Sequence, residues 1–262
     1  MKPAVQGFLD ILEAAHKFNV KRVVNTGSVG SVLDYAKDGD YSCDETQFTD
    51  ENGVVYSYTK SKILQEKETW NLYEKLSDEG NCPDVLFILP TMMAGPVLLK
   101  ETDSVVNMLK MLLHNPHGSM PPYYGGVCDV RESARMHLEA LKKGRTGERY
   151  IVSGDDTLKF SDLGKILAKE YKKYGYKCTE EDTGCFKLWI ASWFDEFTAY
   201  MYEVMDRKIE LKTDKAKKEL GLKAPPLEET LFDMAESLIQ NGYVDDLKKD
   251  YKEEEKKDDK KE

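Results

Sequence analysis

Apolar and polar residues alternate along the chain in two periods, one typical of helices and one typical of buried strands. Between residues 3 and 18, the apolar side chains of Val5, Phe8 and Leu12 form one helical stripe. Residues 21–26 follow with the length and apolar content of a short buried strand. A helix that leads into such a strand is half of an α/β unit, although no strand comes before this helix.

The same order of helix and strand continues along the chain and predicts an α/β fold. Residues 34–56 interrupt it with a polar stretch that predicts a surface loop. Ser161 is expected to cap a later helix. The further predicted elements are a helix over 57–79, a strand over 84–89, a helix over 103–113, a strand over 148–154, a helix over 160–171 and a final helix to residue 238.

Two further segments carry apolar residues at helical spacing. We expect Ala134, Leu138 and Leu141 to form the packed face of one helix, with His137 as a packed or capping histidine rather than a base. Residues 185–205 are rich in aromatic side chains, which at this spacing indicate core or interface. The more specific alternative is that this segment forms a lid over a substrate pocket.

The composition of the chain argues against several classes of protein. The 262 residues are 40% hydrophobic, enough for a sizeable core in one large domain or two intimate ones. No apolar run approaches ~18 residues and the first residues lack a signal-peptide core, so no membrane span is expected. A net charge of −10 and a pI near 5.1 argue against nucleic acid and anionic membranes as partners. Five scattered cysteines without a Cys-x-x-Cys indicate reduced thiols in a cytoplasmic protein.

Two tyrosine–lysine pairs, Tyr56–Lys60 and Tyr58–Lys62, have the spacing that brings side chains together on one helix face. A lysine ammonium near a phenol favours the phenolate, so the tyrosine can exchange a proton nearer neutral pH than its ordinary pKa of about 10. Such a pair can move a proton on or off an alcohol oxygen. The spacing alone does not choose between the two registers.

Other polar residues were considered as site residues. Open α/β sheets gather ligands at strand ends, and Ser28 lies directly after the strand at 21–26. His114 and His117 are separated by a proline and have no acidic or thiol partner at ligand spacing, so no metal site is expected.

Residues 58–62, YTKSK, together with Glu66 resemble the Tyr-x-x-Ser-Lys-x-x-x-Glu motif of the extended short-chain dehydrogenase/reductase family, NAD-dependent epimerase/dehydratase type. Only the Tyr58–Lys62 register matches that motif. The resemblance covers residues 3–245 and is closest to dihydroflavonol-reductase-like carbonyl reductases. Further segments in family order are 26–28 (TGS, where the family usually has Thr-Ser-Ser), 90–96 (PTMMAGP), 129–137 (DVRESARMH) and 213–222 (TDKAKKELGL).

The resemblance implies a partial Rossmann fold, which is a doubly wound parallel sheet without its first strands and glycine-rich loop, and a smaller, mostly helical C-terminal substrate domain. The missing loop would bring backbone N–H groups to the cofactor's pyrophosphate, so the chain alone is expected to lack full activity. The expected boundaries are 1–96 and 127–153 for the dinucleotide-binding part, 97–126 and 154–245 for the substrate-binding part, and 246–262 for a disordered charged tail.

The resemblance also assigns roles. Tyr58 would be the proton donor or acceptor, Lys62 would lower its pKa and hold the nicotinamide ribose, and Ser28 would bind the substrate oxygen. NADP or NAD would supply the hydride, and the substrate would be a small carbonyl compound or alcohol. The cofactor-binding residues are expected to be Thr26, Tyr58, Lys62, Pro90 and Thr91.

Two alternatives remain open on the sequence alone. One keeps the same three catalytic residues and acts on a nucleotide-sugar as an epimerase or dehydratase. The other is a non-catalytic, truncated fragment that acts only in protein interaction. Whether the protein is an enzyme or a fragment, the resemblance implies a homodimer through the helices at 3–18 and 57–78, because the family commonly uses these two helices as a dimer contact.

Overall fold

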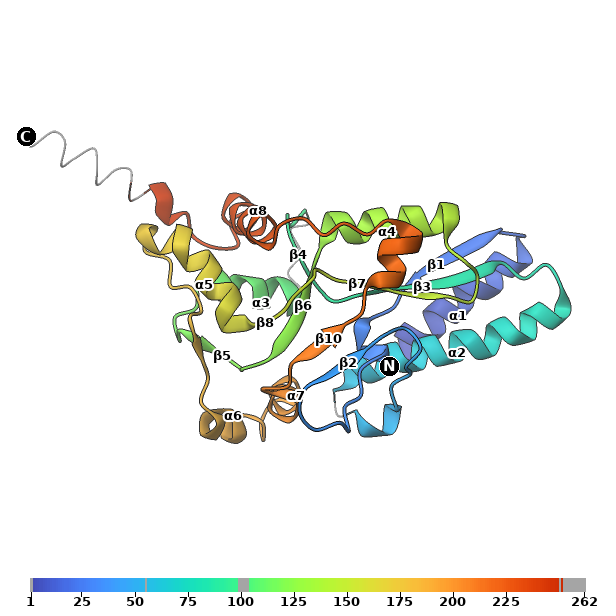
Figure 1. Cartoon of the computed structure of the whole chain (residues 1–262), viewed down its shortest axis with the longest axis horizontal. Coiled ribbons are helices and arrows are strands. Elements are labelled where there is room, and N and C mark those ends of the chain that lie inside the picture. The colour runs from blue at the N-terminus through green and yellow to red at the C-terminus, as the bar shows by residue number, and fades with distance from the viewer. Residues whose placement is uncertain (1, 55, 99–103, 250, 252–262) are drawn as a thin grey trace, which may run out of the picture.

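The computed structural model describes residues 2–54, 56–98, 104–249 and 251. A three-stranded parallel sheet extends from the middle of the molecule toward the right in Figure 1. Its strand order is β1 (Arg22–Thr26), β3 (Asp84–Pro90) and β7 (Arg149–Val152). Val24 pairs with Leu86. The three predicted strands are therefore confirmed, and they are neighbours in one sheet.

Helices cover both faces of this sheet. They are α1 (Lys2–Lys17) and α2 (Ser57–Glu79) on one face, and α4 (Val130–Lys143) on the other (Figure 1). Successive side chains of a strand point to opposite faces, so Phe87 of β3 joins the apolar cluster of Leu12 from α1, whereas Leu86 joins that of Met136 from α4. The central strand β3 is thus buried on both faces, as parallel strands usually are.

A second region lies beyond the sheet, around two small groups of strands. β4 and β6 run parallel while β8 pairs with β6 in the antiparallel sense, and α5 packs against α3 and α8. The bounds are β4 (Met92–Ala94), α3 (Ser104–Leu113), β5 (Ser119–Met120), β6 (Tyr124–Asp129), β8 (Thr157–Lys159), α5 (Phe160–Tyr171), β9 (Glu181–Asp182) and α8 (Leu227–Gln240).

The expected surface loop at 34–56 contains a strand that we did not predict. β2 (Tyr41–Cys43) pairs in parallel with β10 (Ile209–Leu211), which comes from the C-terminal part of the chain. Only three residues of each strand take part, so neither stretch is long enough to display a strand period. The remaining short turns are η1 (Val29–Ser31), η2 (Glu51–Gly53), η3 (Lys172–Tyr174) and the π-helical turn η4 (Ala216–Leu220).

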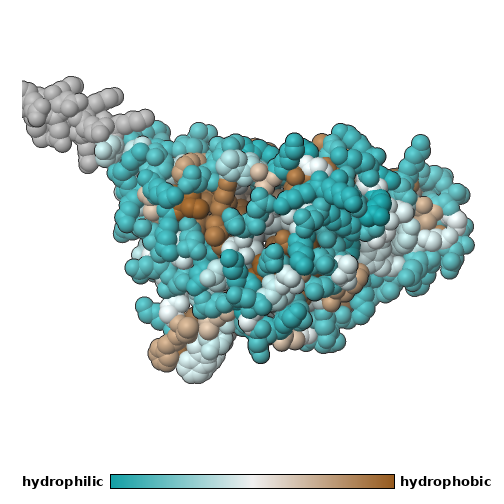
Figure 2. Space-filling view, in the orientation of Figure 1, coloured by the Kyte–Doolittle hydropathy of each residue, from teal (hydrophilic) through white to brown (hydrophobic). Residues whose placement is uncertain are grey.

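The aromatic stripe at 185–205 divides into two helices with different environments, α6 (Cys185–Ala191) and α7 (Glu196–Val204). In α7, Tyr200 is buried, which agrees with the expectation of core. Around α6, by contrast, Phe186 and Phe194 are largely exposed. Figure 2 shows pale and brown atoms projecting at the lower left, where Figure 1 places α6.

Two local expectations were wrong. On α4 the apolar Leu138 and Leu141 are exposed, and the buried positions are instead Met136 and Ala140. Helix α5 begins one residue after Lys159, and Ser161 lies buried inside the helix instead of capping it.

The first residues of the expected tail contact the rest of the structure. Lys248 forms an ion pair with Glu236 of α8, and the ring of Tyr251 meets that of Tyr174 at 5.4 Å. Disorder over 246–262 as a whole stays a prediction. Residues 250 and 252–262 lie outside the described residues.

Three further properties bear on function. All five cysteines are free thiols. Across the described ranges, no helix has the length and apolar character needed to cross a bilayer. The same residues include no group of three His, Cys, Asp or Glu side chains that could hold a metal ion.

Candidate active site

The candidate site starts where β1 ends. The N–H of Gly27 donates to Ile88 O at 2.8 Å and so extends the pairing of β1 with β3 by one residue. A Cβ at position 27 would lie 2.6 Å from Leu89 Cδ2. A side chain at position 27 would therefore require the end of Leu89 to shift.

Ser28 follows in extended conformation and caps the short turn η1. Its Oγ accepts a hydrogen bond from Gly30 N at 3.2 Å. A hydroxyl group that accepts in this way still carries its own proton, which it can donate to a substrate oxygen. Thr59 of α2 packs closely against the same turn, because a Cβ on Gly30 would lie 3.0 Å from Thr59 Cγ2. The turn with Ser28 and the first turn of α2 are therefore in contact.

Helix α2 carries both tyrosine–lysine pairs at its start. Lys62 is half-buried, and its Nζ donates to Thr26 O at 3.1 Å, at the end of β1. Burial lowers the pKa of Lys62. Tyr58 is 52% exposed and lies one helical turn before Lys62. Lys62 thus joins α2 to the strand end that leads into Ser28.

The surroundings of Tyr56 differ from those of Tyr58. Tyr56 is half-buried, and its ring stacks on Tyr200 with centroids 5.3 Å apart. Burial, together with the nearby Glu196 carboxylate, raises the pKa of Tyr56. A raised pKa is the opposite of what a proton-exchanging phenol requires near neutral pH, so these surroundings favour the Tyr58–Lys62 register.

Thr26 is held in place by contacts from two helices, α2 and α4. Its carbonyl oxygen binds Lys62, and its Oγ1 lies 2.8 Å from His137 Nε2. His137 Nδ1 lies 2.8 Å from Ser133 O, which can only accept, so in the neutral ring Nε2 is the acceptor and Thr26 donates. His137 therefore orients Thr26, and its not acting as a base stays a prediction.

Glu66, the last residue of the motif, has a structural partner. Its carboxylate forms an ion pair of 2.5 Å with Arg149 of β7, and both side chains are almost fully buried. The Arg149 guanidinium also donates to Ser31 O at 3.0 Å and to Gln47 O at 2.6 Å. This network ties α2 and the turn after Ser28 to the sheet. A charged residue at the start of an otherwise apolar strand is the signal in the sequence for this contact.

Pro90 and Thr91 lie at the carboxyl end of β3, as expected, and both are buried. Thr91 Oγ1 donates to Ser153 Oγ at 3.2 Å. A role for Pro90 and Thr91 in cofactor binding stays a prediction.

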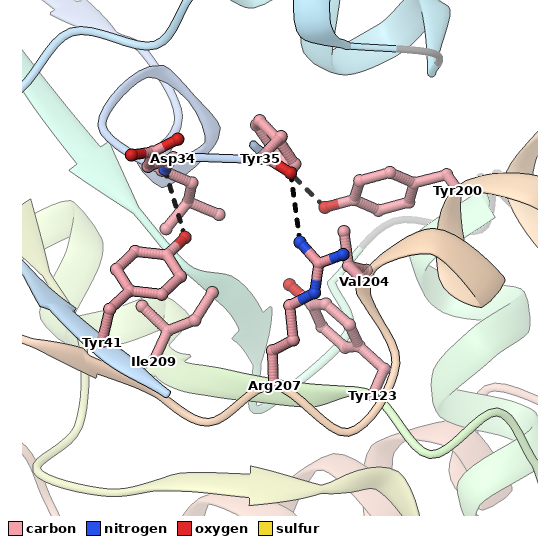
Figure 3. Close-up of a pocket in the computed structure, with 9 residues that line it drawn as sticks. Asp34, Tyr35, Tyr41, Tyr123, Tyr200, Val204, Arg207 and Ile209 are labelled. Carbon is pink, nitrogen blue, oxygen red and sulfur yellow. Dashed lines mark hydrogen bonds between the residues drawn. The ribbon is translucent and has the colours of Figure 1, made fainter. Parts of the chain in front are cut away.

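A cluster of tyrosines next to the site was not predicted. Tyr35, Tyr123 and Tyr200 line a small cavity of about 10 Å³, which is at the lower limit for one water molecule (Figure 3). Tyr35 Oη lies 3.5 Å from Tyr200 Oη. These residues come from three distant segments, so no local spacing in the sequence links them.

A larger open cleft of about 570 Å³ lies between β2, β10 and the residues after β7. Its lining includes Asp40, Ser42, Asp155 and Lys208. Neither this cleft nor the tyrosine-lined cavity includes Ser28, Tyr58 or Lys62 among its lining residues.

No family model matches the chain. Several known proteins are nevertheless similar to it in sequence. The chain is 27% identical to cinnamoyl-CoA reductase 1 of Petunia hybrida over 254 residues, covering 93% of this chain and 67% of the relative. It is 28% identical to the NADPH-dependent methylglyoxal reductase GRE2 of Saccharomyces cerevisiae, covering 91% and 70%. It is 30% identical to an anthocyanidin reductase of Vitis vinifera over 190 residues, covering 66% and 54%.

Solved structures share the fold. The yeast methylglyoxal/isovaleraldehyde reductase Gre2 complexed with NADPH aligns with a TM-score of 0.71 and 26% identity, covering 92% of this chain and 71% of that one. Vestitone reductase from alfalfa has the same TM-score at 21% identity, covering 93% and 73%.

Fold and site together define an α/β protein of the Rossmann type, with its candidate residues at the carboxyl end of a parallel sheet. These relatives and structural neighbours are members of the extended short-chain dehydrogenase/reductase family, NAD-dependent epimerase/dehydratase type, and the chain is similar to them over most of its length. The expected resemblance to dihydroflavonol-reductase-like reductases is confirmed. The chain spans roughly half to 70% of the length of these curated relatives.

Proposed function

We propose that the protein is an NADP- or NAD-dependent oxidoreductase that reduces a carbonyl group or oxidises a secondary alcohol of a small molecule. The observation that carries this proposal is the contact of Lys62 with Thr26 O, which joins the Tyr58 helix to the strand end with Ser28. Relatives named as reductases, one of them NADPH-dependent, support it. They favour a reductase over a nucleotide-sugar epimerase.

The residues present suit the nicotinamide half of such a cofactor. An ammonium group has three N–H bonds, and Thr26 O uses one of those of Lys62, so ribose hydroxyls can bind the others. The cofactor, when bound, supplies the hydride. Thr26, Pro90 and Thr91 would line this half of the site, as proposed from the sequence.

The protein residues would then manage the proton. Tyr58 would give its phenolic proton to the carbonyl oxygen as negative charge develops there, or take it back in the reverse direction. The Lys62 ammonium would stabilise the phenolate that remains. Ser28 Oγ would donate a hydrogen bond to the same substrate oxygen and hold it near Tyr58.

We further propose that the chain alone binds the cofactor weakly. In the described part of the chain, no strand pairs with the outer edge of β1, and no glycine-rich loop between a strand and a helix lies there to receive a pyrophosphate. The two-part domain boundaries, a cytoplasmic location and a homodimer through α1 and α2 are likewise proposals. Sedimentation of the purified chain would test the dimer.

The test of function is titration with NADPH, followed by turnover of an aldehyde or ketone. Tyr58→Phe should abolish turnover while leaving cofactor binding nearly unchanged, because only the transferable proton is lost. Tyr56→Phe is the matched control and should retain turnover. If the chain binds neither NADPH nor NADH, or if Tyr58→Phe turns over like the wild type, the proposal is wrong.

A further inference from the structure

A carboxylate from the C-terminal part of the chain holds the start of the helix with Tyr58. Glu196 begins α7, and its Oε1 accepts a hydrogen bond from Ser57 N at 2.5 Å, while its Oε2 accepts from Ser57 Oγ at 3.0 Å. We propose that Glu196 is a positioning residue that caps α2 from outside and so fixes Tyr58 relative to Lys62. The chemical importance of this role rests on the proposed function.

Helix α2 needs such a partner. Its own N-cap residue, Tyr56, makes no side-chain capping bond, and its first turn contains no acidic residue. The first N–H groups of a helix have no partner within the helix, and a negative charge near them is stabilising. Glu196 supplies both the acceptor and the charge, although it lies 139 residues away in the sequence.

Aromatic rings hold the same turn from a second direction. The Tyr56 ring stacks on Tyr200 and meets Phe197 edge-on at 5.5 Å, and both partners belong to α7. Tyr56 is only two residues before Tyr58. The backbone that enters α2 is therefore fixed by a carboxylate and by two rings of one helix.

The same helix also reaches the segment that follows Ser28. Tyr200 Oη lies 3.5 Å from Tyr35 Oη, and the two rings are 5.8 Å apart (Figure 3). Tyr35 comes seven residues after Ser28. Helix α7 thus contacts both segments that carry candidate catalytic residues, the loop after β1 and the start of α2.

Helix α7 has a side-chain cap at its own N-terminus. Asp195 caps it by accepting from Thr198 N at 2.6 Å and from Thr198 Oγ1 at 2.7 Å. This local cap fixes the first turn of α7, where Glu196 stands. Glu196 can therefore act as a fixed support for α2 rather than as a loose surface carboxylate.

The direct test is hydrogen exchange of the purified chain, read in peptides that cover residues 57–64. In Glu196→Ala the amides of the first turn should exchange roughly fivefold faster, because loss of a helix cap costs about 1 kcal/mol. Glu196→Gln keeps an acceptor oxygen and should recover part of the protection. Glu203→Ala on the same helix is the control and should exchange like the wild type.

Peptides from β3 report on global unfolding, and their exchange can rise by no more than the same factor, because the cap also contributes to overall stability. Unchanged exchange at residues 57–61 in Glu196→Ala would overturn the capping claim. This measurement needs no cofactor, so its result is independent of whether the proposed function holds.

The positioning of Tyr58 needs a second readout, the pH titration of its ring carbons by NMR. Glu196→Ala and Glu196→Gln remove the same negative charge, so the effect of charge cancels when they are compared. If Glu196 positions Tyr58, the alanine variant lets the phenol move away from Lys62, and its titration midpoint should be higher than in the glutamine variant. Equal midpoints would limit Glu196 to a structural role and overturn the proposal.

Discussion

The two outer edges of the central sheet are protected in different ways. At the β7 edge, the loop after β2 supplies polar partners, since Ile151 N donates to Glu45 Oε1 at 2.9 Å and Arg149 donates to Glu45 O at 3.0 Å. At the β1 edge, no strand among the described residues pairs with the outer side, and the neighbouring Phe18 and Leu141 are exposed.

The difference indicates that the β7 edge is the one protected as an outer edge of the sheet. An edge strand presents unpaired backbone groups, and native proteins cover them with loops or charges. Glu45 and Arg149 do this for β7, whereas β1 has exposed apolar neighbours, and three of its own five residues are only partly buried. The candidate site lies on the β1 side, at Thr26 and Ser28, so the less protected edge is the one next to the proposed chemistry.

The largest expected effect concerns the ion pair that supports the β7 side. Glu66→Ala leaves the Arg149 guanidinium buried without its carboxylate, and loss of one partner of a buried pair costs about 3–5 kcal/mol. Urea unfolding should therefore shift to a much lower midpoint.

Lys67→Ala is the matched control, because it breaks an exposed ion pair with Glu51, which contributes little to stability. If the two variants lose equal stability, the Glu66–Arg149 pair does not support this edge.

A second comparison concerns α4, which lies against the β1 side. Met136→Ala should cost about 2–5 kcal/mol, because the side chain is fully buried beneath the sheet. Leu138→Ala, two residues later, should change the free energy of unfolding by at most about 0.5 kcal/mol, because the side chain is 58% exposed. A large loss in Leu138→Ala would mean that this face is covered in solution.

The smallest effect is a pH dependence at the β7 edge. Burial raises the pKa of Glu45, so the folded state binds this proton more tightly than the unfolded state does. The resulting stability is present in full below the ordinary pKa of the carboxyl group and is lost as the pH rises through the folded value.

Glu45→Gln cannot ionise and keeps an oxygen that can accept from Ile151 N. The stability of the wild type relative to this variant should therefore fall as the pH rises above the ordinary pKa of a glutamate carboxyl group. Parallel stability curves for the two proteins would contradict the assignment.

Local patterns in the sequence were sufficient for much of the fold. The stripe in α1 and the apolar run of β3 are set by neighbours in the chain, and both were predicted correctly. On α4 the same rule failed, because apolar residues that occupy one helix face need not be the ones that a sheet covers. The motif at residues 58–66 indicated where in the chain the candidate site lies.

The support around the site could not be predicted in the same way. The Glu196–Ser57 contact joins residues 139 positions apart, and the Tyr35–Tyr200 contact spans 165. Neither produces a periodic pattern, since each depends on how the C-terminal part packs against the sheet. Arg149 was not predicted to have a partner either, although a charged residue at the start of a buried strand signals one.

The central claim is that the Lys62 ammonium acidifies the Tyr58 phenol. NMR titration of the tyrosine ring carbons tests it most directly, with Lys62→Met compared with the wild type and Lys60→Met as control. The account predicts that the Tyr58 midpoint lies below the ordinary value of about 10 in the wild type, rises in Lys62→Met and stays unchanged in Lys60→Met. A Tyr58 midpoint that Lys62→Met does not move would contradict it.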